Sequence, residues 1–105
     1  MTAKEFLMGL PDKVRPETLE GLETVFHFDI EGDGGGQVTV KVEEGTCVAE
    51  EGLHGDPRCV VRAKEDNLMN VLRGETNPLM AVLTGKLKIS NQGEMLKYAK
   101  IFGLM

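Results

Sequence analysis

Two histidines and two cysteines are the residues of this sequence whose side chains are best suited to catalysis or metal binding. They are His27, His54, Cys47 and Cys59. Catalysis by such a residue requires a partner that sets its protonation state, and none of the four belongs to a recognisable motif with one. His54 and Cys59 also lack the further paired ligands that a zinc site needs. We therefore predict no catalytic residues and interpret the segment from His54 to Cys59 as a loop.

An acidic, glycine-rich segment resembles the first half of a calcium-binding loop. Asp29, Glu31 and Asp33 precede Gly34 at the spacing of the first oxygen ligands and the obligatory glycine. The last position of such a loop carries a bidentate glutamate, and here it is Val40. A turn between two strands explains the glycines fully, so we predict neither a metal nor a cofactor.

The two cysteines are too few for a disulfide framework. Residues 1–10 include Lys4 and Glu5, which do not fit the unbroken apolar run of a signal peptide. We therefore predict a cytoplasmic protein with reduced, buried thiols. Thiol chemistry at Cys47 or Cys59 is a weaker alternative, because it requires a lowered pKa that no nearby charge in the sequence explains.

The elements that must position these residues follow from the periodicity of apolar side chains. Alternation predicts strands over residues 24–30, 37–42, 46–50, 59–63 and 86–90. Helical spacing and capping residues predict helices over residues 2–10, 66–73, 78–84 and 93–102, with a helical turn after Pro16. Pro11 is expected to end the first helix. Within the first strand we expect Phe26 and Phe28 to be buried and His27 to face solvent on the opposite side.

Length and charge limit the classes of partner. With 105 residues, 41% of them hydrophobic, the chain is predicted to form one folded domain. Its net charge of −5 opposes binding to nucleic acids. Residues 84–105 are nevertheless locally basic, with four lysines, among them Lys97 and Lys100, against one glutamate. This stretch is either a solvated face or a transient contact with an anionic membrane surface.

The order of several short motifs resembles that of the sterol carrier protein type 2 (SCP-2) family over nearly the whole chain. In the first half they are Val25, Phe26, Phe28 and Ile30, then Gly35-Gly36, Val38, Val40 and Val42, and then Glu44-Gly45. In the second half they are Asp56-Pro57, Asp66, Leu68, Gly74, Pro78, Ala81 and Gly85-Lys86-Leu87-Lys88-Ile89. The chain ends in Gly103-Leu104-Met105, unlike a peroxisomal Ser-Lys-Leu address, so a stand-alone domain of bacterial type is expected.

The resemblance implies an α+β fold with a five-stranded, mostly antiparallel sheet in the order 3-2-1-4-5 and helices over one face. It also implies non-enzymatic binding and transfer of a small hydrophobic ligand, such as a fatty acid, an acyl-CoA or a sterol-like lipid, in an apolar tunnel. We expect the C-terminal helix to act as a lid. The expected wall residues are Phe26, Phe28, Leu79, Met80, Leu83, Leu87, Met95, Ala99 and Phe102.

Two alternatives stay open at the level of the sequence. Met80 and Met95 lie on predicted core faces of different helices, where methionine serves equally as core filler or as the adaptable wall of a lipid cavity. The protein is therefore either a lipid carrier, or a protein-interaction or accessory domain whose core is solid and holds no ligand. The volume of the cavity distinguishes the two, and the oligomeric state is open.

Overall fold

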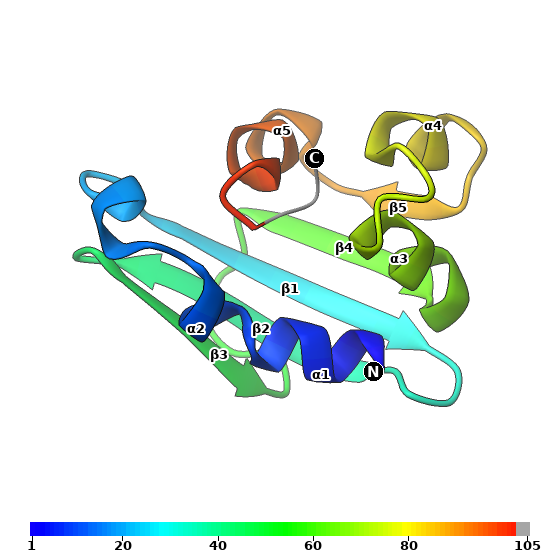
Figure 1. Cartoon of the computed structure of the whole chain (residues 1–105), viewed down its shortest axis with the longest axis horizontal. Helices are drawn as coiled ribbons and strands as arrows, with labels where there is room; N and C mark the ends of the chain where they lie inside the picture. Colours follow the sequence, from blue (N-terminus) through cyan, green and yellow to red (C-terminus); the bar gives the residue numbers. More distant parts are fainter. Residues whose placement is uncertain (103–105) are drawn as a thin grey trace.

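The computed structural model describes residues 1–102, which form one sheet with helices on one of its faces (Figure 1). The strands are β1 (Thr24–Glu31), β2 (Gly36–Glu43), β3 (Thr46–Glu51), β4 (Cys59–Lys64) and β5 (Leu87–Ile89). The helices are α1 (Ala3–Met8), α2 (Leu10–Lys13), α3 (Glu65–Leu72), α4 (Pro78–Leu83) and α5 (Gln92–Ala99), and the 3-10 helix η1 spans Pro16–Leu19. The expectation about a peroxisomal address concerns Gly103, Leu104 and Met105, which lie outside the described residues.

The sheet has the order β3-β2-β1-β4-β5, so the predicted α+β fold and strand order are confirmed. β1, β2 and β3 form an antiparallel meander, and β4 and β5 are also antiparallel. The tight turn between β2 and β3 is formed by Glu44 and Gly45, which both have positive φ, at 51° and 75°. Two-residue hairpin turns of this kind match the twist of the strands. β1 and β4 pair in parallel at the centre, which makes the sheet mixed.

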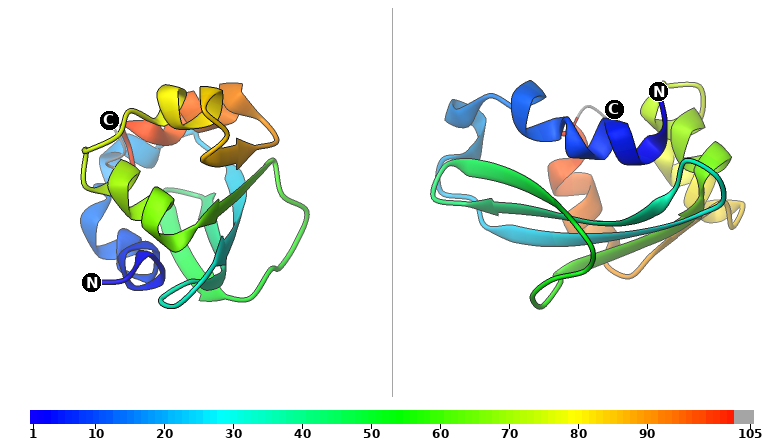
Figure 2. Two further views of the ribbon diagram at one scale, coloured as in Figure 1. Left: turned by 90° about the vertical axis from the view of Figure 1, so that its right-hand side faces the viewer. Right: turned by 90° about the horizontal axis from the view of Figure 1, so that it is seen from below.

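The helices cover one face of the sheet, as expected. α1 and α2 contact β2 and β3, whereas α3, α4 and α5 contact β4 and β5 (Figures 1 and 2). Beneath them, Phe26 and Phe28 of β1 and Val40 of β2 are at most 1% exposed. Each large apolar side chain buried in this way contributes about 1.5–3 kcal/mol to folding. Within residues 1–102, no helix is long and apolar enough to cross a membrane.

The opposite face of the sheet is not open to solvent at its centre, so the expected exposure of His27 is wrong. The loop between β3 and β4 crosses beneath this face (Figure 2, right) and leaves His27 only 8% exposed. The Nε2 atom of His27 lies 2.8 Å from the carbonyl oxygen of His54 in that loop. The Thr39 hydroxyl donates to the carbonyl oxygen of Gly52 at 2.8 Å and accepts from the backbone N–H of His54 at 2.9 Å. Strand alternation placed His27 on the correct face but could not reveal the loop that covers it.

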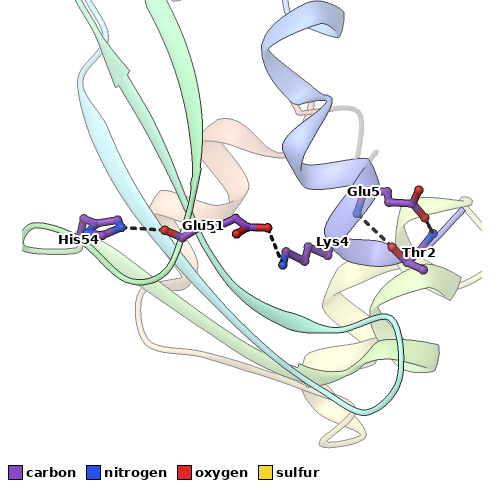
Figure 3. Close-up of polar contacts among 5 residues, drawn as sticks. All are labelled: Thr2, Lys4, Glu5, Glu51 and His54. Atoms are coloured by element: carbon purple, nitrogen blue, oxygen red, sulfur yellow. Dashed lines mark hydrogen bonds and ion pairs between the residues drawn. The ribbon is translucent and has the colours of Figure 1, made fainter.

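The N-terminal segment is joined to the sheet by polar contacts (Figure 3). Thr2 and Glu5 form the predicted capping box of α1. Lys4 makes a 2.7 Å ion pair with Glu51 of β3. Pro11 does not end this helix as expected, because α1 already ends at Gly9 and Pro11 lies in the first turn of α2. Proline fits there, since the first N–H groups of a helix have no intrahelical acceptor.

Candidate functional site

An apolar groove lies between α4, β5 and α5, and it is almost closed. Its walls are Pro78, Leu79, Val82, Ile89, Gln92, Met95, Leu96 and Ala99. The space within it measures about 10 Å³. A cavity of that size holds about one water molecule, and an acyl chain needs far more room. The groove therefore marks where apolar surfaces meet, and a ligand can enter only if a helix moves.

Behind α5, an aromatic cluster fills the space between helix and sheet. The ring centroids of Phe26 and Phe102 are 5.3 Å apart, and those of Phe26 and Tyr98 are 5.7 Å apart. Both pairs meet edge to face, the arrangement that aromatic quadrupoles favour. Tyr98 is fully buried, and its hydroxyl donates to the carbonyl oxygen of Glu23 at 3.2 Å. In this conformation the cluster is solid core.

The predicted wall residues divide into three groups. Leu79, Met95 and Ala99 line the groove together. Phe26 and Phe102 meet in the aromatic cluster, while Phe28 and Leu87 are buried in the core. Met80 and Leu83 are 54% and 78% exposed and do not line the groove.

The prediction that Met80 occupies a core face is wrong for a structural reason. α4 lies at the surface of the molecule and buries only Pro78 and Ala81. The apolar residues of this short helix surround its whole circumference, so helical periodicity could not identify the inward side. Leu79, Met80 and Leu83 are therefore exposed.

Several groove residues were missed by sequence reasoning. Val82, Ile89, Gln92 and Leu96 line the groove although none was a predicted wall residue. Tyr98 was missed as a core residue, yet its position three residues after Met95 and four before Phe102 is the spacing of one helical face. That spacing could have identified Tyr98 as a core residue. The contribution of β5 to the groove depends on how α4 and α5 pack over the sheet edge and could not be read from local sequence.

The two helices beside the groove are anchored to different degrees. α5 begins at Asn91, whose side chain caps the helix at Glu94 and also donates to the carbonyl oxygen of Arg58 at 3.2 Å. The Thr24 hydroxyl donates to the Glu94 carboxylate at 2.5 Å, joining α5 to β1. α4 has an N-cap of its own, Asn77, but buries far less side-chain surface. The weaker wall of the groove is therefore α4.

In the described part of the chain, the side chains of His27, His54 and Cys59 contact backbone carbonyl oxygens and not one another. Burial raises the pKa of the Cys47 thiol to about 11 and also raises the pKa of Cys59. Both thiols are therefore protonated and unreactive near neutral pH, and their predicted burial is confirmed. Within residues 1–102, no group of three His, Cys, Asp or Glu side chains could hold a metal ion.

Comparison with known proteins gives a family match and a consistent set of structural neighbours. The model of the SCP-2 sterol transfer family matches residues 3–105. The solution structure of palmitated SCP2L2 from Aedes aegypti is similar with a TM-score of 0.75 and 17% identity, covering 97% of this chain and 95% of that one. Sterol carrier protein 2 from Yarrowia lipolytica, in its apo form, has a TM-score of 0.70 and 17% identity, with coverage of 96% and 87%. No curated protein sequence matches the chain.

A larger protein shares the same fold in part of its length. The inverting sec-alkylsulfatase Pisa1 from Pseudomonas sp. is similar with a TM-score of 0.80 and 17% identity. The likeness covers 100% of this chain but only 16% of the sulfatase, so the chain spans about a sixth of that enzyme. At these identities the neighbours establish the fold alone.

Proposed function

Because the chain belongs to the SCP-2 sterol transfer family, we propose that it binds the apolar part of a lipid between α4, β5 and α5 and carries it without catalysing a reaction. Lipid binding and transfer in general is the role that the family supports. The observation that carries the proposal for this chain is the groove itself, with apolar walls from three elements and one weakly held side. A fatty acid, an acyl-CoA or a sterol-like molecule offers the matching surface.

Entry of the lipid requires the groove to open, and α4 is the element that we expect to move. It buries only Pro78 and Ala81, whereas α5 buries Met95, Tyr98 and Ala99 and is joined to β1 through Glu94. Displacing α4 exposes little additional apolar surface, because Met80 and Leu83 already face solvent. We therefore propose that α4 is the lid and that α5, with Met95 and Ala99, forms the fixed wall of the groove.

The decisive test compares two tryptophan substitutions in α4. Val82 lines the groove, and Leu83 is its exposed neighbour on the same helix. Val82→Trp should weaken binding of palmitate by about tenfold or more, because the indole occupies the space that the acyl chain needs. Leu83→Trp should leave affinity unchanged within about twofold. Binding of wild-type protein should also strengthen from C10 to C16 chains, since each buried methylene contributes about 0.8 kcal/mol.

The same experiment distinguishes the alternative, an accessory or protein-interaction domain that holds no ligand. The 10 Å³ volume of the groove favours this alternative. It predicts no saturable binding of any chain length by delipidated wild-type protein. It also predicts that Val82→Trp lowers the unfolding midpoint strongly, because a close-packed interior does not accept added bulk. Binding without a dependence on chain length would also contradict the carrier proposal.

Delivery of the lipid would involve transient contact with an anionic membrane through Lys97 and Lys100. Both side chains are exposed on the C-terminal segment. Lys97→Glu with Lys100→Glu should slow transfer to anionic vesicles at low salt, and added salt should slow the wild type in the same way. Affinity for a soluble acyl ligand should not change. Equal transfer rates for the variant and the wild type at low salt would show that these lysines are only solvated.

A further inference from the structure

Four cations lie close together on β4, on β5 and in the turn before β5. Val61, Ala63 and Leu87 are buried on the helix side. Alternation along the strands therefore places Arg62 and Lys88 on the other side, where the register sets them directly opposite each other. Lys64 follows Arg62 by two residues on β4, and Lys86 lies in the turn just before β5; both line the same surface depression. We call Arg62, Lys64, Lys86 and Lys88 the basic depression.

Carboxylates neutralise only part of this charge. The Arg62 Nε atom lies 4.0 Å from an oxygen of Asp29, and Glu31 is the register partner of Lys64 on β1. No carboxylate oxygen of residues 1–102 lies within 4.0 Å of the amino groups of Lys64, Lys86 or Lys88. Like charges opposite each other on adjacent strands destabilise a sheet. A chain with a net charge of −5 thus concentrates unpaired positive charge at one position.

The surface at these cations is concave and of ligand size. The basic depression measures about 360 Å³, and Asn67 and Glu31 complete its polar lining. A second depression of about 390 Å³ adjoins it and shares Arg62 and Lys88. Small-molecule sites usually measure about 300–1,000 Å³. Arginine offers paired N–H donors to a phosphate group, and lysines add charge, so the donor set fits phosphate oxygens.

Edge protection explains the cluster only in part. Lysines on an edge strand prevent pairing with other chains, and Lys88 on β5 and Lys86 just before it could serve that purpose. Arg62, however, lies where β4 is paired with both β1 and β5 and needs no such protection. From the cations, their like-charge register and the concave surface together, we infer that the basic depression is a second binding site, one that takes the phosphate groups of an anionic ligand. This inference does not depend on lipid in the groove.

The first test uses inorganic pyrophosphate as the probe. Titration should shift the backbone amide resonances of residues 62–64 and 86–88 and raise the unfolding midpoint of the wild-type protein, since a ligand of the folded state stabilises it. Arg62→Gln with Lys88→Gln should weaken binding by about tenfold or more. The matched control is Lys13→Gln with Arg15→Gln, which removes the same two charges from the exposed N-terminal segment. It should change affinity by less than about threefold, because distant charges are screened.

A second arm distinguishes the source of the phosphate. Binding to vesicles of phosphatidylglycerol, but not of phosphatidylcholine, that is lost in the Arg62→Gln, Lys88→Gln variant would assign the site to phospholipid headgroups. Pyrophosphate binding without vesicle binding would assign it to a soluble phosphate ester. Binding of neither probe would overturn the inference. An equal loss of binding in the control variant would also overturn it, because net charge alone would then account for the effect.

Discussion

The hydroxyl of Thr39 fastens the β3–β4 loop to the far face of the sheet. It donates to the carbonyl oxygen of Gly52 and accepts from the N–H of His54, in a site that is 2% exposed. Thr39→Val keeps the shape but leaves both loop groups without this partner, which should cost about 1–3 kcal/mol. Urea denaturation measures the loss.

Thr39→Ser is the matched control for this prediction. It retains the hydroxyl and should keep most of the stability, although threonine suits a strand better than serine does. If Thr39→Val were as stable as the wild type, the loop would be held by other contacts.

The buried thiol of Cys47 makes stability fall at alkaline pH. Its pKa is raised by burial from 9.0 to about 11 in the folded protein. Between these values the unfolded chain releases the thiol proton while the folded chain keeps it, so rising pH favours unfolding, and below pH 9 the contribution is fully present. The free energy of unfolding should therefore drop more between about pH 8 and about pH 10.5 in the wild type than in Cys47→Ala.

Comparing the two proteins isolates the Cys47 contribution. The pKa of Tyr98 is also raised by burial, but Tyr98 is present in both proteins and its effect cancels. Identical pH dependence of urea unfolding in wild type and Cys47→Ala would show that the thiol ionises as readily in the folded state as in the unfolded one.

Individual residues were predictable where their neighbours in sequence decide their surroundings. Alternation in β1 correctly predicted that Phe26 and Phe28 are buried, because successive side chains of a strand point to opposite faces. The predicted exposure of His27 was wrong because the loop that covers this side chain lies 27 residues further along the chain. The predicted burial of Met80 was wrong because α4 is apolar on every side. Burial imposed by distant segments is not encoded in local periodicity.

At the level of elements, α4 should be the least protected helix on the β4–β5 side. It buries two residues, whereas α3 buries Leu68, Met69, Val71 and Leu72. Segments with few buried contacts open at low free energy. Hydrogen exchange measured by mass spectrometry should therefore be about tenfold or more faster in α4 than in α3.

The exchange experiment has an internal reference in β1, which is paired on both sides. Its amides should be among the slowest to exchange. Protection of α4 equal to that of β1 would contradict its role as the lid of the groove.

The elements themselves were largely predictable, because caps and turns are determined by short stretches of sequence. Thr2 and Asn77 cap their helices as expected, and the strand ranges agree within about one or two residues. Pro11 was the exception, since Gly9 already ends α1 and proline suits the first turn of a new helix. The groove was less predictable than its walls, because its volume depends on how α4, β5 and α5 pack together.

For the whole molecule, opening of the groove should limit the rate of lipid binding. With about 10 Å³ available in the closed state, the binding-competent conformation must form before palmitate enters. The observed rate in stopped-flow measurements should then reach a plateau as palmitate concentration rises. Gly85→Ala should raise that plateau, because Gly85 follows α4 with φ at 76° and alanine strains this position.

Gly45→Ala is the matched control for the kinetic prediction. Gly45 has φ at 75°, and an added methyl group at either glycine meets no atom within 4 Å, so both substitutions act through backbone strain alone. Gly45 lies in the β2–β3 turn, away from the groove, and its substitution should leave the plateau unchanged. A rate that increases linearly with palmitate, without a plateau, would show that opening of the groove does not limit binding.

The parallel pairing of β1 with β4 also affects how the chain assembles during synthesis. β1, β2 and β3 can pair as soon as they leave the ribosome, because each is joined to the next by a short turn. The second edge of β1 is paired only after residues 59–64 have been made, and the aromatic cluster forms only after Tyr98 and Phe102 have been made. Contacts between distant segments form slowly. Until these segments have been made, a nascent chain exposes first an open strand edge and then an uncovered phenylalanine face, the kind of surface that chaperones recognise.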